Sequence, residues 1–104
     1  MNDQELARQI VAHLGGDGPN NYAAYSIVID GIAHWMPAEK FVRDWCVAGA
    51  MMEKQGNGIE YALIVDKWEA SYTYEESSFK QNIIVLNESL PRALNEACAE
   101  AHRS

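Results

Sequence analysis

The stretch IEYALIVDKWEASYTYEESSFKQNIIVL, residues 59–86, decides the fold, because it predicts three β-strands that follow one another closely. Residues 59–66 and 81–86 are rich in apolar and β-branched side chains, and residues 67–74 alternate between apolar or aromatic and polar ones. Such alternation is typical of a half-buried strand, and tight turns between short strands favour antiparallel pairing. Residues 75–78, EESS, are predicted as an acidic turn. One face of the middle strand is expected to carry Trp68, Ala70, Tyr72 and Tyr74.

An Asp30-Gly31 pair upstream of this stretch predicts a β-hairpin. It separates residues 25–29 from residues 32–36, and both runs consist mainly of residues that favour strands. Asp-Gly is typical of a two-residue hairpin turn, because both central positions of a type I′ turn require a positive φ. We therefore expect two further antiparallel strands here.

Three amphipathic helices are expected around the strands. The first spans about a dozen residues and begins with an Asn2–Glu5 capping box. The longest runs from Pro37 to about Gln55 and has an apolar stripe that we expect to pack against the sheet. The last begins near residues 89–91. The stripe of the middle helix consists of Phe41, Trp45, Ala48 and Met52.

Together these elements predict a single α+β domain over residues 1–104, in the order α-β-β-α-β-β-β-α. An antiparallel sheet of four or five short strands would be covered by the three amphipathic helices. The length of 104 residues suits one domain, and a hydrophobic fraction of 48% is sufficient for a packed core.

The chain is acidic, with 8 Lys and Arg against 15 Asp and Glu and a formal net charge of −7. This balance argues against direct binding of DNA or RNA, which requires a basic surface, and against binding to an anionic membrane. The first residues are polar and acidic, unlike a signal peptide, and no apolar run reaches the roughly 18 residues of a membrane-spanning helix. We therefore expect a cytoplasmic protein. Cys46 and Cys98 both fall in helical patterns and are expected to be buried, unpaired thiols.

The sequence has no recognisable catalytic or metal-binding motif. Its histidines and cysteines are scattered singly, without the paired spacing of zinc sites. Its carboxylates are numerous, but an acid pair would need a cleft that the sequence does not specify. We therefore expect no enzymatic activity, no metal and no cofactor, and an enzyme that acts on a small molecule through an acid pair ranks last.

Two features fit either a structural or a binding role. The acidic excess lies at the ends of the chain: residues 1–36 sum to −3 and residues 59–104 to −4, whereas residues 37–58 are neutral. This excess can be a solvated surface or a binding surface. Aromatic side chains of adjacent predicted strands are expected mostly in the core, but any part of the sheet left uncovered would form an interface patch. These aromatic residues are Tyr61, Trp68, Tyr72 and Tyr74.

Residues 41–54, FVRDWCVAGAMMEK, resemble the Trp-containing helix of small phage and prophage accessory proteins described as phage ABA-sandwich domains. In that family a tryptophan strand and a Ser-Leu-Pro entry to a final helix follow, and residues 67–70 (KWEA) and 88–94 (ESLPRAL) are similar to them. The resemblance covers roughly residues 35–104 and lies in packing motifs. It implies a phage or prophage gene product in a bacterial cytoplasm, and it supplies no catalytic residue.

We expect, as the first hypothesis, a non-enzymatic protein that binds and inhibits a host protein machine, as CRISPR inhibitors do. Its acidic side chains would occupy a basic nucleic-acid groove of that host protein. The contact residues expected for this first hypothesis are Glu60, Glu69, Glu75 and Glu76, with Tyr72 and Tyr74 as anchors. The alternative is a phage accessory or structural module that forms a homodimer through an uncovered sheet face.

Overall fold

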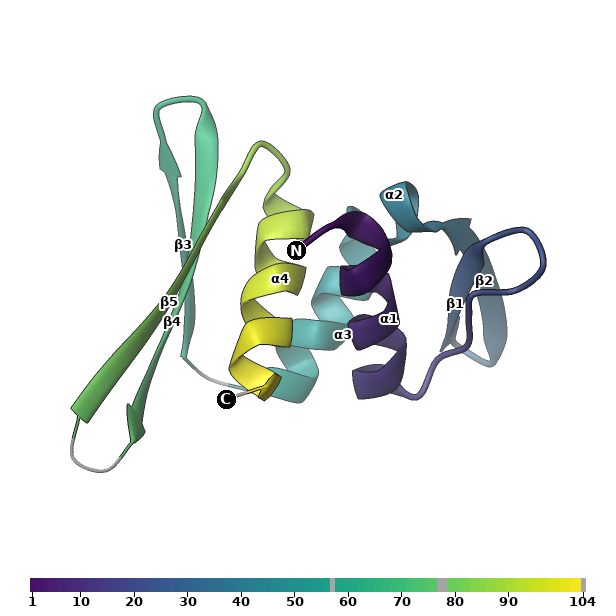
Figure 1. The fold of residues 1–104 in the computed structure, drawn as a ribbon, viewed down its shortest axis with the longest axis horizontal. Helices are drawn as coiled ribbons and strands as arrows, with labels where there is room; N and C mark the ends of the chain where they lie inside the picture. The colour runs from purple at the N-terminus through teal and green to yellow at the C-terminus, as the bar shows by residue number, and fades with distance from the viewer. Residues whose placement is uncertain (57, 77–78, 104) are drawn as a thin grey trace.

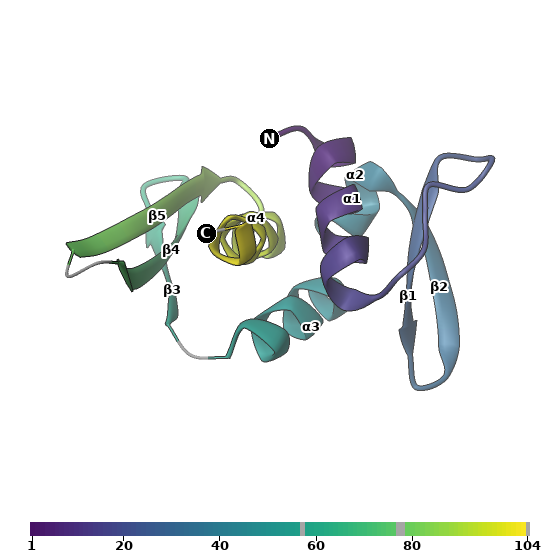
Figure 2. The same cartoon turned by 60° about the horizontal axis from the view of Figure 1, so that its bottom comes forward.

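The computed structural model describes residues 1–56, 58–76 and 79–103, with the side chains of residues 74–76, 79–81 and 103 excepted. A layer of helices lies between two antiparallel sheets, as Figures 1 and 2 show from two directions. The elements are α1 (Asp3–Leu14), β1 (Ala24–Ile29), β2 (Ile32–Pro37), α2 (Ala38–Phe41), α3 (Trp45–Gln55), β3 (Ile59–Ile64), β4 (Lys67–Glu76), β5 (Phe79–Asn87) and α4 (Leu90–Arg103).

The α+β class, the antiparallel pairing and the order of the strands are confirmed. Two differences from the expected architecture appear: the strands divide into the sheets β1–β2 and β3–β4–β5, and the described part of the chain contains a fourth helix. Two apolar clusters fill the interfaces on either side of the helix layer. One surrounds Leu6 and Phe41 beneath β1, and the other surrounds Ala70 and Leu94 beneath β4. None of the described helices is long and apolar enough to cross a membrane.

The first helix and the first hairpin form as expected. The Asn2 side chain accepts a hydrogen bond from the Glu5 backbone N–H at 2.8 Å and donates one to the Glu5 carboxylate at 3.2 Å, which completes the capping box. Asp30 and Gly31 have φ values of 52° and 81°, so the turn between β1 and β2 has the positive φ angles that its sequence predicts. β1 buries Tyr25 against the helices.

The expected middle helix is interrupted, which corrects the prediction of one helix from Pro37 to Gln55. α2 ends at Phe41 and α3 starts at Trp45, because the carboxylate of Asp44 accepts a hydrogen bond from the Val47 N–H at 3.0 Å and caps a new helix. The chain turns at this cap, so the apolar stripe does not continue across it. Trp45 is therefore 62% exposed, and Cys46 is exposed as well, contrary to the prediction that both are buried.

A buried amide on α4 compensates for this interruption. Val42 follows the last residue of α2, and its carbonyl oxygen accepts a hydrogen bond from the Asn95 side chain at 2.9 Å. Asn95 is fully buried, so its amide satisfies a polar group that would otherwise be shielded from water at the end of α2. The break in the helix and the polar residue in the core thus belong together.

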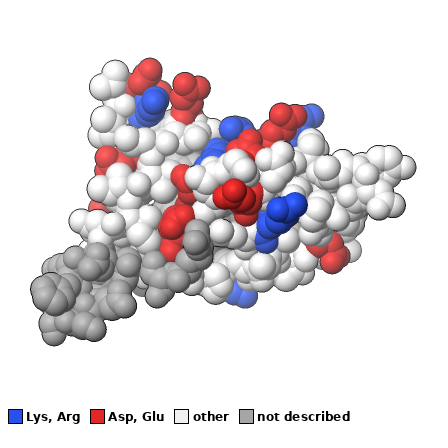
Figure 3. Space-filling model, viewed as in Figure 1, with Lys and Arg blue, Asp and Glu red and all other residues white. Residues whose placement is uncertain are grey.

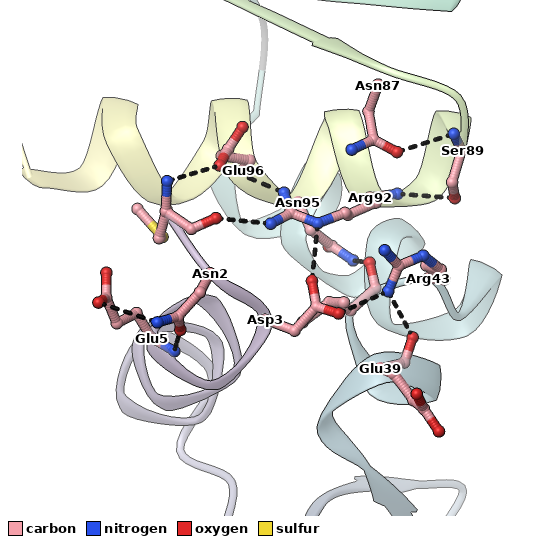
Figure 4. Close-up of polar contacts among 12 residues, drawn as sticks. Asn2, Asp3, Glu5, Glu39, Arg43, Asn87, Ser89, Arg92, Asn95 and Glu96 are labelled. Carbon is pink, nitrogen blue, oxygen red and sulfur yellow. Dashed lines mark hydrogen bonds and ion pairs between the residues drawn. The ribbon is translucent and has the colours of Figure 1, made fainter.

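A buried arginine links α4 to the start of the chain (Figure 4). The guanidinium of Arg92 donates to Asp3 at 3.0 Å and to the carbonyl oxygen of Met1 at 2.7 Å, and lies 3.2 Å from Glu96. Arg43 approaches the other oxygen of Asp3 at 2.8 Å and also donates to the Glu39 carbonyl. Partial burial alone would raise the pKa of Asp3, but hydrogen bonds and charge from the two guanidiniums outweigh burial and lower it.

Two histidines meet where α1 and α4 end. The rings of His13 and His102 lie 3.9 Å apart, centroid to centroid. Burial lowers the pKa of His13, and the positive charges of His102 and Lys54 lower it further. The neutral form of His13 is therefore favoured in the folded protein.

The second sheet is regular, and its middle strand is longer than expected. Glu75 and Glu76 do not form the predicted turn: their backbones extend β4 and pair with residues 80 and 79 of β5. The rest of that predicted turn, residues 77 and 78, lies outside the described residues. Ala70 is fully buried and pairs with Tyr61 on one side and Val85 on the other. α4 therefore covers the face of the sheet on which these three residues lie.

Candidate protein-binding surface

The second sheet is covered by α4 on one face only, as Figures 1 and 2 show. Side chains alternate along a strand, and paired residues share a face, so the register defines the opposite, uncovered face. We call it the outer face. Its rows are Ile64 and Lys67; then Ala62, Glu69 and Leu86; then Glu60, Ser71 and Ile84.

The outer face carries large apolar side chains in contact with solvent. Ile64, Ile84 and Leu86 are 47%, 60% and 55% exposed. Ile84 and Leu86 are neighbours along β5, whereas Ile64 lies on β3 across the intervening strand β4. Single exposed apolar residues are ordinary, but several on one sheet face are typical of a surface that another protein covers. Glu69 lies in the same row as Leu86, so this surface combines apolar contacts with negative charge.

The face beneath α4 is also incompletely covered, at β3. Tyr61 and Leu63 lie on this face and are each 56% exposed. The ring of Tyr61 leans edge-on against Trp68, with centroids 6.4 Å apart. β3 lies at the border of the sheet and therefore exposes apolar side chains on both of its faces.

The structure separates the contact residues expected from the sequence. Glu60 and Glu69 lie in adjacent rows of the outer face. Tyr72 lies on the opposite face, where its ring covers Gly58 so closely that a Cβ added at Gly58 would be 2.8 Å from it. Tyr72 therefore does not share a surface with these glutamates. The side chains of Tyr74, Glu75 and Glu76 lie outside the described residues.

Sequence reasoning missed the apolar residues of the outer face. Ile84 and Leu86 were expected to belong to a strand, without assignment to a covered or an uncovered face. Two features of the sequence could have indicated this exposed face: β5 is apolar on both of its faces, and a single helix follows it. One helix covers only one face of a sheet, so the other face must be exposed or bound by something else.

The described residues also surround three open hollows, of about 520, 400 and 390 Å³. The largest, between α1 and α2, includes the carboxylates of Asp3 and Glu39. Both Arg43 and Arg92 bind Asp3 and hold its pKa low, so this carboxyl group does not have the raised pKa of a general acid. Among the described residues, no three His, Cys, Asp or Glu side chains come together as metal ligands would.

The acidic excess is not collected into one patch on the face seen in Figure 3, where acidic and basic side chains are interspersed over the helices. The β1–β2 end of the molecule has few charges in the same view. Comparison of the chain with protein-family models, curated proteins and solved structures gave no match. The outer face is therefore a candidate site on the basis of its geometry alone.

Proposed function

We propose that this chain acts by binding another protein, and that the outer face of β3–β4–β5 is the contact surface. The observation that carries the proposal is the presence of three half-exposed aliphatic side chains, Ile84 and Leu86 on β5 and Ile64 on β3, on a sheet face that no described element covers. Covering the exposed half of each side chain would stabilise a complex by about 1 kcal/mol.

The charge of the surface favours a partner with basic residues around an apolar centre. Glu60 and Glu69 lie among the aliphatic side chains and outnumber Lys67 on the same face, and the chain as a whole carries a net charge of −7. Opposite charges on a partner would speed association and disfavour other acidic proteins. A host protein with a basic nucleic-acid groove fits this description, and inhibition of such a host defence protein is the specific form of the proposal that the phage-like motifs support.

The state of Asp3 argues against its use as a general acid or base. The largest hollow contains two carboxylates, but Asp3 is bound by two guanidiniums and serves as a structural anchor. A general acid or base needs a pKa near the working pH, whereas the pKa of Asp3 is lowered.

Affinity capture from a bacterial lysate tests the proposal when variants of matched exposure are compared. Ile84→Lys combined with Leu86→Lys places two cations on the outer face, and Val28→Lys combined with Ile32→Lys does the same at the similarly exposed first hairpin. We expect the wild-type chain and the hairpin variant to retain a protein that the outer-face variant does not retain. This protein should be released more readily at about 0.5 M salt than at about 0.1 M, because salt screens charge pairs.

The identity of a captured protein must then be confirmed by reconstitution from purified components. Loss of binding with the outer-face variant, measured by calorimetry, supports the proposal. Equal affinity of the wild-type chain and the outer-face variant for the same partner would refute the assignment of the surface, and binding by neither would refute the proposed function for that partner.

A further inference from the structure

Within the described part of the chain, β3 has an unprotected edge. Its backbone pairs there with β4 alone, through six consecutive partners without a bulge. Natural proteins protect such edges with proline, lysine, bulges or a covering segment. The β3 sequence IEYALI contains neither proline nor lysine, and its single charge is Glu60. By contrast, β1 in the first sheet is partly shielded, since the backbone of Asp17 exchanges two hydrogen bonds with Ser26.

Both faces of β3 are apolar and exposed next to this edge. Tyr61 and Leu63 project on the α4 side, and Ile64 projects on the outer face. A strand with solvent-exposed apolar residues on both faces and unpaired backbone groups at its edge is a template for another strand. The occupant must satisfy the backbone and cover side chains on both faces, which another apolar strand does.

We propose that the β3 strands of two copies pair antiparallel, centred on Ala62, and join their sheets into one of six strands. A two-fold axis perpendicular to the sheet brings the edges together and leaves α4 on the same side in both copies. Tyr61 then lies opposite Leu63 of the second copy, an aromatic–aliphatic pair on the α4 side. Glu60 lies opposite Ile64 of the second copy on the outer face.

Charge complementarity favours this register over those centred on Tyr61 and on Glu60. Within one copy, Ile64 pairs with Lys67 of the next strand. Glu60 of the other copy lies opposite this Ile64, so Glu60 and Lys67 are on strands whose axes are about 10 Å apart. Their two long side chains can meet over the intervening Ile64. Centring the pair on Tyr61 would instead place Glu60 opposite Ala62 of the second copy, and beyond it Glu69, which is a like charge. Centring it on Glu60 would place two carboxylates directly opposite each other.

The dimer and the proposed partner contact share Ile64 but are otherwise separate. The dimer uses the edge of β3, and Ile84 and Leu86 on β5 stay accessible in both copies. Three side chains and one strand edge per copy form a small interface, which is typical of weak complexes. We therefore expect dissociation in the range of tens of micromolar.

Sedimentation velocity and amide hydrogen exchange over protein concentrations from about 1 to 500 μM test the proposal in this affinity range. We expect a dimer to form with increasing concentration and the amides of residues 59–64 to exchange more slowly in the dimer. Leu63→Lys should weaken the dimer more than tenfold, because it removes the aliphatic partner of Tyr61 and places a charge from each copy in a small interface. Leu86→Lys is the matched control, since Leu86 is equally exposed on β5 and lies away from the edge; it should leave dimerisation unchanged.

A charge exchange tests the register. Lys67→Glu places a carboxylate near Glu60 of the other copy, and the two-fold symmetry repeats this repulsion at a second position. The substitution should weaken the dimer about tenfold, given the modest energy of surface ion pairs. Glu60→Lys combined with Lys67→Glu restores opposite charges and should restore the affinity. A monomer throughout the concentration range, or dimerisation lost with Leu86→Lys but retained with Leu63→Lys, would overturn the proposal. Failure of the charge exchange to restore a weakened dimer would overturn the register.

Discussion

Replacing Arg92 with methionine should destabilise the fold far more than replacing Arg43, although both arginines bind the same carboxylate. The Arg92 side chain is 7% exposed and the Arg43 side chain 42%. Arg92→Met keeps an unbranched side chain of comparable length in the helix but leaves the Met1 carbonyl without its donor, Asp3 with one guanidinium, and Glu96 with the Met1 amino group at 3.6 Å as its remaining partner. Breaking a fully buried pair costs about 3–5 kcal/mol, and the partial exposure of Asp3 and Glu96 reduces the expected loss to about 2–3 kcal/mol.

Urea unfolding followed by circular dichroism measures the effect. The expected loss corresponds to a decrease in Tm of about 10–20 °C for a domain of this size. Arg43→Met should cost at most about 1 kcal/mol, because surface ion pairs contribute little. Arg92→Lys separates charge from geometry: an ammonium group does not span the three acceptors, so this variant should resemble Arg92→Met more than the wild type.

The acid side of the stability profile gives a second measurement. The pKa of Asp3 is lower in the folded chain than its ordinary value of 3.8, so its contribution is present above that value and is lost as pH falls through the folded-state pKa. Arg92→Met should therefore flatten the decline in stability below about pH 4. Equal losses for Arg92→Met and Arg43→Met, with unchanged acid profiles, would refute the importance of the buried network.

Three further predictions concern the helices. Asp44→Ala removes the cap of α3 and should lower the free energy of unfolding by about 1 kcal/mol in urea titrations, with Asp44→Asn nearly neutral. The pKa of His13 is lowered below 6.5 in the folded chain, so the unfolded chain takes up a proton at higher pH. The free energy of unfolding should therefore fall as pH decreases through 6.5. His13→Gln should flatten this part of the pH dependence in a series of thermal melts. Burial raises the pKa of Cys98 to about 11, so iodoacetamide at pH 8 should label the exposed Cys46 alone in the folded chain, as counted by intact mass.

Local signals in the sequence specify much of the fold. The Asn2–Glu5 box and the Asp30-Gly31 turn depend on neighbouring residues only, and both form as expected. The interruption at Asp44 was missed because the flanking residues also suit a continuous helix, and an aspartate at this position is compatible with both an exposed helical site and a cap. The choice depends on distant contacts, among them the buried Asn95 that binds the end of α2.

The candidate surface illustrates the same limit. That residues 81–86 form a strand follows from their β-branched side chains, but the exposure of Ile84 and Leu86 depends on which face α4 covers. That choice is made by packing between elements far apart in the chain, such as Leu94 against Ala70. Tyr72 and Glu69 are three residues apart in sequence and lie on opposite faces of one strand, so a single contact surface could not contain both.

The position of α4 between the two sheets has a consequence for synthesis of the chain. The sheets consist of hairpins between neighbouring segments, whereas α4 joins Asp3 to Arg92 across 89 positions and is made after every other element of the fold. A chain released before residue 90 is added therefore leaves Leu6, Ala48 and Ala70 without the helix that covers them, and it should bind chaperones that recognise exposed apolar surface.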